Sequence, residues 1–249
     1  LGNLFRRKGR LVLTLLALTT AGVMFLVVMS LIASVNLTLD NEMNRQGYDV
    51  RIGFTGDQDI EEVLELTAGI DGVVDAEMWY SRNATILRAG ERLQDSAGLG
   101  AQLLGIPAGT EMYTPIIVEG RWLESGDDEQ VIVISQETAS KNNLTVGDWV
   151  GLDLGELGSA EWEIIGLYRV IYGSGFVIEP IYAPLEAVAR ATDQMGQATQ
   201  VLITGEIENI DQETAFAELI KTKYEDQGWG IDFYTTTARL EQRVYADNQ

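Results

Sequence analysis

A long uncharged segment near the N-terminus constrains this chain more than any other feature. Residues 11–35, LVLTLLALTTAGVMFLVVMSLIASV, carry no charge, and four basic side chains lie just before them: Arg6, Arg7, Lys8 and Arg10. As an α-helix, these 25 residues extend about 37 Å, which exceeds the ~30 Å hydrocarbon core of a bilayer. The sequence therefore predicts a transmembrane helix over residues 11–35.

Two other interpretations of this segment are a cleaved export signal and the core helix of a soluble protein. A secretory signal has an apolar region of about 7–15 residues followed by a small-residue cleavage site. The uncharged run is longer than that, and LIASV is only a faint match to a cleavage site. A helix in a soluble protein has a polar face, which this run lacks. Its threonine and serine hydroxyls can bond back to the helix backbone.

The flanking charges predict the orientation of the helix. Positive residues favour the cytoplasmic side of a membrane, so residues 1–10 form a cytoplasmic basic segment and the rest of the chain lies outside. A second interpretation is that residues 1–10, which include Leu1, Leu4 and Phe5, lie along the inner leaflet as a short interfacial helix. Residues 36–47 are expected to form a helical stalk that stops at Gly47.

The remainder of the chain is strongly acidic. The protein has 17 basic and 38 acidic residues and a net charge of −21. Four of the basic residues and none of the acidic ones precede residue 40, so residues 40–249 hold 13 basic against 38 acidic residues. A domain with this excess of negative charge repels nucleic-acid phosphates and anionic lipid head groups. We therefore expect an outside domain in water, with no nucleic-acid partner.

The composition also argues against an enzyme. The chain has no Cys and no His, which excludes Cys–His and Ser–His–Asp catalysis and any disulfide framework. The acidic run GDDE at residues 126–129 lacks the spacing of a calcium loop and is typical of a solvated turn. GLGAQLLG at residues 98–105 lacks the spacing of a phosphate-binding loop. The sequence predicts no catalytic residue, no metal site and no cofactor in this chain.

Local patterns predict an α+β domain in two lobes. Residues 48–111 have the order strand, helix, strand, with Asp57 or Asp59 starting the helix. Residues 181–237 repeat this order, and their longer helix has Phe216, Leu219, Ile220 and Tyr224 on one side. The two halves are expected to form one β-α-β lobe. Residues 112–180 contain short apolar strands separated by Gly and Asp turns, and predict a small inserted β-rich lobe.

Tryptophan supplies the only candidate binding surface. Trp122, Trp149, Trp162 and Trp229 could line an apolar groove for a ligand or a partner. The alternative is that these residues belong to the core, which is more usual for Trp at strand positions.

Several segments, taken together, resemble the MacB/FtsX-like ABC transporter permeases. NLFRRKGRLVLTLLAL is similar to the start of their first membrane helix, and GYDVRI is similar to their entry into the extracytoplasmic domain. EGRWLESGDDEQVIVISQETASKNNLTVGDWVGLDL, AEWEIIGLYR and YAPLEAVARAT follow in the order that the family shows. The resemblance covers nearly the whole chain, and it rests on the order and spacing of degenerate pieces.

The resemblance implies a first transmembrane helix followed by a MacB-like extracytoplasmic core domain, in which a porter-like lobe carries the inserted β-rich lobe. It implies a permease of the bacterial inner membrane whose outside domain couples ATP hydrolysis by a separate ABC ATPase to transport or mechanotransmission. ATP would bind in that ATPase. A second permease copy or half, membrane lipid and an extracytoplasmic protein are the other partners implied.

The chain departs from the family because it shows only the first of the membrane helices. Residues 238–249 are therefore expected to be a stalk towards a second transmembrane helix that is missing here. The chain is compatible with the second half of a duplicated permease. Two further functions stay open at this point: a regulatory module that activates a cell-wall hydrolase, and the sensor domain of a one-helix membrane receptor.

Overall fold

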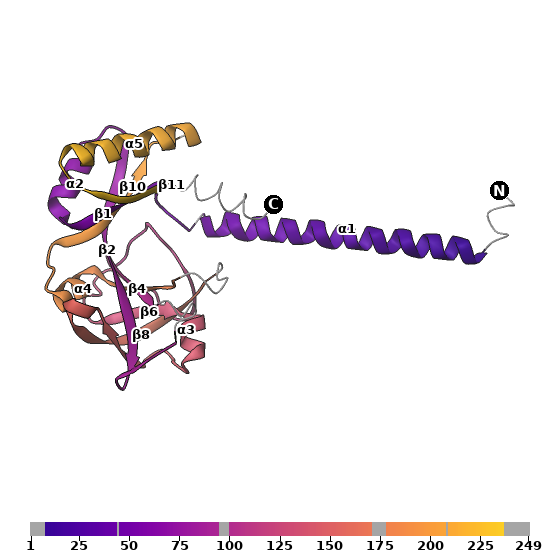
Figure 1. Ribbon diagram of the computed structural model, residues 1–249, viewed down its shortest axis with the longest axis horizontal. Helices are drawn as coiled ribbons and strands as arrows, with labels where there is room; N and C mark the ends of the chain where they lie inside the picture. Colours follow the sequence, from indigo (N-terminus) through magenta and orange to yellow (C-terminus); the bar gives the residue numbers. More distant parts are fainter. Residues whose placement is uncertain (1–7, 44, 95–99, 171–177, 208, 237–249) are drawn as a thin grey trace. The chain divides into compact units, whose positions relative to one another are not determined.

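The computed structural model describes residues 8–43, 45–94, 100–170, 178–207 and 209–236. The chain divides into two units, Leu1–Asn44 and Arg45–Gln249, which are described separately below. The first unit contains one helix, and the second contains the mixed sheet-and-helix domain (Figure 1).

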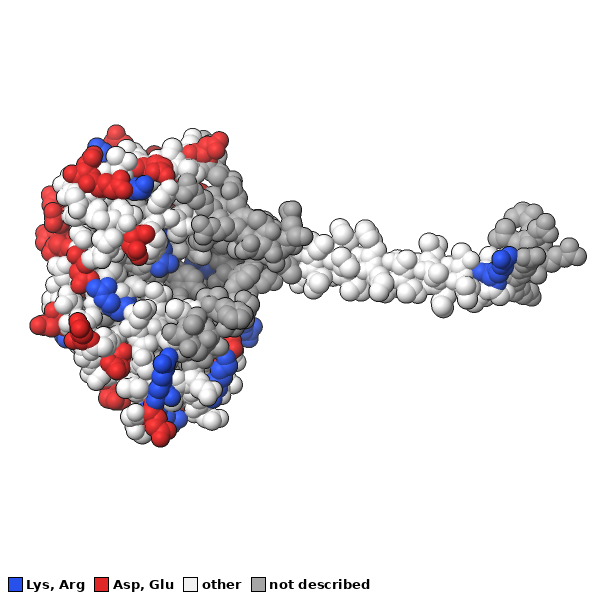
Figure 2. All heavy atoms as spheres, viewed as in Figure 1, with Lys and Arg blue, Asp and Glu red and all other residues white. Residues whose placement is uncertain are grey.

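The helix of the first unit, α1 (Lys8–Met43), contains the predicted transmembrane segment. Its stretch Gly9–Ser34 has a mean hydropathy of 2.5 and is long and apolar enough to cross a membrane. Apolar side chains are exposed all around this stretch, and Arg10 is its one charged residue (Figure 2). Three hydroxyls donate 2.8 Å hydrogen bonds to the carbonyl four residues earlier: Thr14, Thr19 and Thr20. These bonds satisfy the polar groups, as the sequence predicted.

The domain contains an open sheet lobe with β-α-β-β-α-β order. Its elements are β1 (Val50–Asp59), α2 (Ile60–Ala68), the first part of β2 (Val73–Arg88), β10 (Gln197–Gly205), α5 (Ile210–Asp226) and β11 (Ile231–Thr236). The strands run in the order β11-β1-β10-β2, and each neighbouring pair is antiparallel. We call this region the sheet lobe; it corresponds to the β-α-β lobe expected from two sequence halves.

Both helices of the sheet lobe begin at a side-chain cap and cover the same face of the sheet (Figure 1). Asp59 and Asn209 each accept a 3.0 Å hydrogen bond from the backbone N–H three residues later, which satisfies a free donor of the first turn. Val63 of α2 and Ile220 of α5 pack with Ile52 and other strand residues in one buried cluster. The helices are therefore held by the apolar face of the sheet.

The second lobe is β-rich. Its elements are the rest of β2, then β3 (Glu91–Arg92), β4 (Ala101–Ile106), β5 (Ile116–Gly120), β6 (Val131–Ser135), α3 (Gln136–Lys141), β7 (Trp149–Asp153), the 3-10 turn Gly155–Leu157, β8 (Ser159–Arg169), β9 (Pro180–Pro184) and α4 (Leu185–Thr192). Within the described residues, six strands form a closed ring in the order β2-β4-β9-β6-β8-β7, and β7 pairs again with β2. We call this region the barrel lobe.

Apolar side chains fill the interior of the ring. Leu103, Ile132, Leu152, Trp162 and Ile164 are all fully buried there. β6 is buried along its whole length, since alternate residues face the ring interior and a second cluster that joins the two lobes. A strand buried on both faces has a continuous apolar sequence, here VIVI, instead of an alternating one.

The two lobes share β2 and a common apolar cluster. β2 pairs with β10 up to Trp79 and with β4 from Tyr80, so it leaves one lobe and enters the other without a break. Trp79 and Leu202 of the sheet lobe pack against Leu104, Val133 and Tyr182 of the barrel lobe. These shared elements connect the two lobes.

The lobe boundaries differ from those predicted. The sequence placed the inserted lobe at residues 112–180, but β4, β9 and α4 also belong to the barrel lobe. The difference arises because β2 is one strand of 16 residues, whose second part was expected to belong to the first lobe. The predicted stalk also differs, since α1 ends at Met43 and not at Gly47. The second predicted stalk, residues 238–249, lies outside the described residues.

Candidate functional site

The described residues contain no group of three or more acidic side chains placed to hold a metal ion. The acidic run at residues 126–129 belongs to a turn. Arg121 donates two hydrogen bonds to Asp127, from Nη1 at 2.6 Å and from Nη2 at 2.9 Å, and the Glu124 backbone N–H donates a third at 2.8 Å. The hydrogen bonds from Arg121 lower the pKa of Asp127. This carboxylate therefore holds the turn between β5 and β6.

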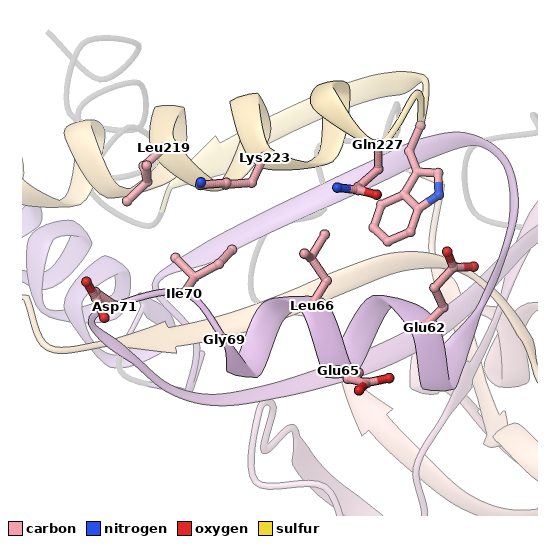
Figure 3. Close-up of a pocket in the computed structure, with 10 residues that line it drawn as sticks. Glu62, Glu65, Leu66, Gly69, Ile70, Asp71, Leu219, Lys223 and Gln227 are labelled. Carbon is pink, nitrogen blue, oxygen red and sulfur yellow. The ribbon is translucent and has the colours of Figure 1, made fainter.

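The candidate site is an open groove between α2 and α5 on the outer surface of the sheet lobe, with a volume of about 690 Å³ (Figure 3). Leu66 and Ile70 on the α2 side and Leu219 on α5 point towards each other across it (Figure 3). Trp229, which follows α5, also lines the groove. Leu219 is 43% exposed.

Buried contacts beneath the groove fix its walls. The Tyr224 hydroxyl of α5 and the Thr67 hydroxyl of α2 share a 2.5 Å hydrogen bond, and both residues are fully buried. Burial raises the pKa of Tyr224 well above its usual range. The Trp229 ring lies 5.4 Å from that of Tyr224 and 6.0 Å from that of Phe54. The groove is therefore a feature of the packed helical layer.

Charges on the groove rim are mainly acidic. Glu62, Glu65 and Asp71 line the α2 side, and Lys223 lines the α5 side. All four side chains are exposed to solvent. Acidic side chains are also spread over the visible surface of the domain (Figure 2). The groove thus combines an apolar floor with a negative edge.

A second structural feature lies where the chain enters the domain. We call it the entry clamp, residues 45–47 paired with residues 112–114. Gln46 and Tyr113 form an antiparallel bridge. The Gly47 N–H donates to the Met112 carbonyl at 2.9 Å, and the Thr114 N–H donates to the Arg45 carbonyl at 3.1 Å. A Cβ at Gly47 would overlap the Glu111 carbonyl oxygen, so this close approach requires glycine.

The entry clamp contacts both lobes. On the sheet lobe, the Thr204 hydroxyl of β10 donates to the Gly47 carbonyl at 2.9 Å. On the barrel lobe, the Tyr113 ring stacks on Tyr182 of β9 with centroids 5.6 Å apart, and it meets Trp122 edge-on at 6.4 Å. Burial raises the pKa of Tyr182. The segment that follows α1 in the sequence is thus attached to both halves of the domain.

The structure does not bring the four candidate tryptophans onto one surface. Trp162 is fully buried inside the barrel, so it belongs to the core and not to a binding surface. Trp122 is half-buried beside the entry clamp, and Trp149 is 55% exposed on β7. Only Trp229 lines the groove. Leu219, which also lines the groove, was expected on the apolar side of its helix and was not singled out as a surface residue.

The basic residues that predicted the topology lie at the start of the first unit. Arg6 and Arg7 are outside the described residues, Lys8 is the first residue of α1, and Arg10 is exposed on that helix. Their predicted role in orienting the helix stays a prediction.

Comparison with known protein families gives a match over most of the chain. Residues 11–223 match the profile of the family described as the MacB-like periplasmic core domain. The match begins in α1 and ends in α5, so it spans both units. No curated protein sequence matches the chain.

Two solved structures share the fold. The periplasmic region of MacB from Actinobacillus actinomycetemcomitans has a TM-score of 0.53 at 12% identity, over 81% of this chain and 94% of that one. The extracellular domain of the noncanonic ABC-type transporter YknZ from Gram-positive bacteria has a TM-score of 0.52 at 16% identity, over 76% of this chain and 99% of that one. At these identities the likeness is one of fold.

Proposed function

Because this chain belongs to the family of MacB-like periplasmic core domains, we propose that its domain moves in response to ATP hydrolysis by a separate ABC ATPase. In this proposal the chain is part of an ABC-transporter-type permease, which also contains a second permease copy or half. α1 crosses the bacterial inner membrane with its basic end in the cytoplasm, and the domain lies outside. The domain transmits movement to a cargo or to a protein partner.

The entry clamp is the observation that carries the proposal. Movement that reaches the domain through the membrane helix must pass through the residues that follow it. Those residues are not a loose linker, because they pair with residues 112–114 and bond to β10. Tyr113 continues the contact into the aromatic cluster around Tyr182. A displacement of residues 45–47 would therefore reach both lobes through packed contacts.

Co-purification tests the partner. The full-length permease would be isolated from gently solubilised bacterial membranes, with and without a non-hydrolysable ATP analogue. We expect an ABC ATPase to be recovered with it. If no ATPase is recovered under conditions that preserve a known permease complex, the permease assignment fails and a one-helix sensor becomes the leading alternative.

A distance measurement tests the coupling. The chain has no native Cys, so spin labels can be placed on two introduced cysteines, at Glu225 on α5 and at Glu137 on α3. We expect the distance distribution to shift when the ATP analogue is added to the assembled complex. Gly47→Ala should abolish this shift while the ATPase still co-purifies, because the added Cβ separates the two strands of the entry clamp.

Gly56→Ala is the matched control for the coupling test. Gly56 lies in β1, and a Cβ there would meet no atom within 4 Å. It should leave the nucleotide-dependent shift unchanged. An unaltered shift in Gly47→Ala would show that movement does not pass through the entry clamp.

A further inference from the structure

The groove between α2 and α5 has no role in the coupling described above. Its apolar and acidic side chains indicate what kind of partner it binds. We propose that it is the docking site for an amphipathic helix of an extracytoplasmic partner protein, with Lys or Arg beside its apolar anchors. The proposal concerns binding alone, and it holds whether the domain moves a cargo or transmits a signal.

The apolar floor supplies the affinity. Leu66, Ile70 and Leu219 present side chains along the groove, and Trp229 adds an aromatic surface. A helix that binds in a groove uses anchors spaced at i, i+3 or i+4, and i+7, which matches an elongated apolar floor between two helices. The groove is open to solvent along its length (Figure 3), whereas small-molecule sites bury most of their ligand. The shape therefore favours a protein segment.

The charge of the rim supplies the specificity. Three of the charged residues that line the groove are acidic and one is basic, and residues 40–249 are strongly acidic as a whole. An anionic lipid surface or the same face of a second copy would bring like charges together, which is unfavourable. A helix with basic residues on both sides of its apolar stripe would meet Glu62 and Glu65 along one edge.

The groove is pre-formed, which lowers the cost of binding. The buried hydrogen bond between Thr67 and Tyr224 holds α2 and α5 together below the floor. Trp229 is fixed by its ring contacts with Tyr224 and Phe54. Walls that need no rearrangement lose little conformational entropy when a partner binds.

The test uses the full-length permease in detergent micelles and three synthetic helical peptides of the same length, each with a fluorescent label. The first peptide has a Leu stripe flanked by Lys, the second has Glu in place of Lys, and the third is a scrambled version of the first without a stripe. Fluorescence anisotropy would measure binding in the absence of ATP and of the ATPase. A failure of the coupling function would therefore not affect the result.

We expect saturable binding of the Lys-flanked peptide, and no saturable binding of the Glu-flanked or the scrambled peptide. Glu62→Lys should weaken this binding about tenfold at low salt, since it replaces an attractive charge by a repulsive one. Glu61→Lys is the matched control, because Glu61 occupies the same first turn of α2 but does not line the groove. It should change the dissociation constant less than about twofold.

A second pair of variants tests the apolar anchor. Leu219→Ser should weaken binding about tenfold, and its 43% exposure in the free protein means that the domain should still fold. Trp149→Ser is the control, since it removes an exposed apolar side chain from the barrel lobe.

Several results would overturn the proposal. One is equal binding of the scrambled peptide, which would indicate general electrostatic attraction. Another is equal weakening by Glu61→Lys and Glu62→Lys. A third is a failure of the Lys-flanked peptide to bind while dodecyltrimethylammonium binds saturably and in a Leu219-dependent manner. That result would mean that the groove binds a small cationic amphiphile and not a helix.

Discussion

In the sheet lobe, two helices cover one face of an open sheet, whereas in the barrel lobe the strands close around their own core. The sheet lobe presents the outer surfaces of α2 and α5 to solvent, and the space between them is the groove. The barrel interior is filled by Trp162 and its neighbours. The same chain therefore produces one lobe with a concave helical surface and one lobe packed to its centre.

This difference suggests a division of roles between the lobes. A closed ring of strands has few ways to change shape without breaking hydrogen bonds, so the barrel lobe is expected to move as a rigid body. The helices of the sheet lobe lie on one face of a sheet, and the Thr67–Tyr224 hydrogen bond joins them below the groove. A partner that binds between them would contact a surface that is already formed.

The largest effect on stability is expected when a cavity is opened in the core of one lobe. Trp162→Ala removes a fully buried ring from the barrel and should lower the free energy of unfolding by about 3–5 kcal/mol. Ile220→Ala opens a cavity under α5 in the sheet lobe and should cost about 2–4 kcal/mol. Hydrogen exchange of the full chain in micelles, read by mass spectrometry, would locate each loss of protection.

We expect Trp162→Ala to lower protection in β6 and β8, and Ile220→Ala to lower it in β1 and β10. Each variant is the control for the other. Equal loss in both lobes for both variants would show that the shared strand β2 makes the domain a single cooperative unit, and the contrast between the lobes would then be one of shape alone.

A smaller effect is expected from the hydrogen bond beneath the groove. Tyr224→Phe removes the bond to Thr67, whose hydroxyl still donates to the Val63 carbonyl at 2.6 Å. No buried hydroxyl is left without an acceptor, so the cost should be about 1 kcal/mol in the free energy of unfolding. Denaturant titration would measure it. A cost as large as that of Ile220→Ala would mean that this bond holds the helical layer together.

Tyr224 also makes the stability of the fold depend on pH in the alkaline range. Burial raises the pKa of Tyr224 in the folded state, whereas an unfolded tyrosine ionises near pH 10. As the pH rises above about 10, the unfolded state loses this proton and the folded state keeps it, so stability falls. Tyr224→Phe should therefore show a shallower fall above pH 10 than the parent protein. Parallel stability curves would contradict this.

Local sequence patterns predicted much of the fold, because helix caps and hydrophobic spacing depend on residues that are close together in the sequence. Asp57 or Asp59 was expected as a helix cap, and Asp59 is the cap. The amphipathic spacing in residues 211–228 predicted the helix observed as α5. The closure of the barrel could not be predicted from these local patterns. It depends on β7 pairing with both β2 and β8, and on a single contact between Val133 and Tyr182. These pairings join residues far apart in the sequence, so no local pattern encodes them.

The site was predicted less well than the fold. Trp229 was a candidate surface residue, and it lines the groove. The apolar side of α5 was also foreseen, but the sequence does not say which of its residues the sheet covers. Ile220 is fully buried, while Leu219 next to it is 43% exposed, on a different side of α5. Exposure here depends on which side of the helix faces the sheet, which only the folded chain determines.

The smallest effect is expected at a surface turn of the barrel lobe, where Asp127→Asn removes a charge without changing shape. Asp127 accepts two hydrogen bonds from Arg121 and one from the Glu124 N–H. The substitution should cost at most about 1 kcal/mol at neutral pH, because the pair is partly exposed to solvent. Thermal unfolding of the full chain in micelles, followed over a range of pH, would measure the cost.

The pH dependence distinguishes a charge effect from a packing effect. Arg121 lowers the pKa of Asp127 in the folded state below the value of about 4 that an unfolded aspartate has. The contribution of this carboxylate is therefore present above pH 4 and is lost as the pH falls through the lower, folded pKa. The difference between Asp127→Asn and the parent protein should shrink in that acidic range. A difference that stays constant with pH would mean that the turn is held by its backbone geometry, and that the barrel lobe does not need this ion pair to stay closed.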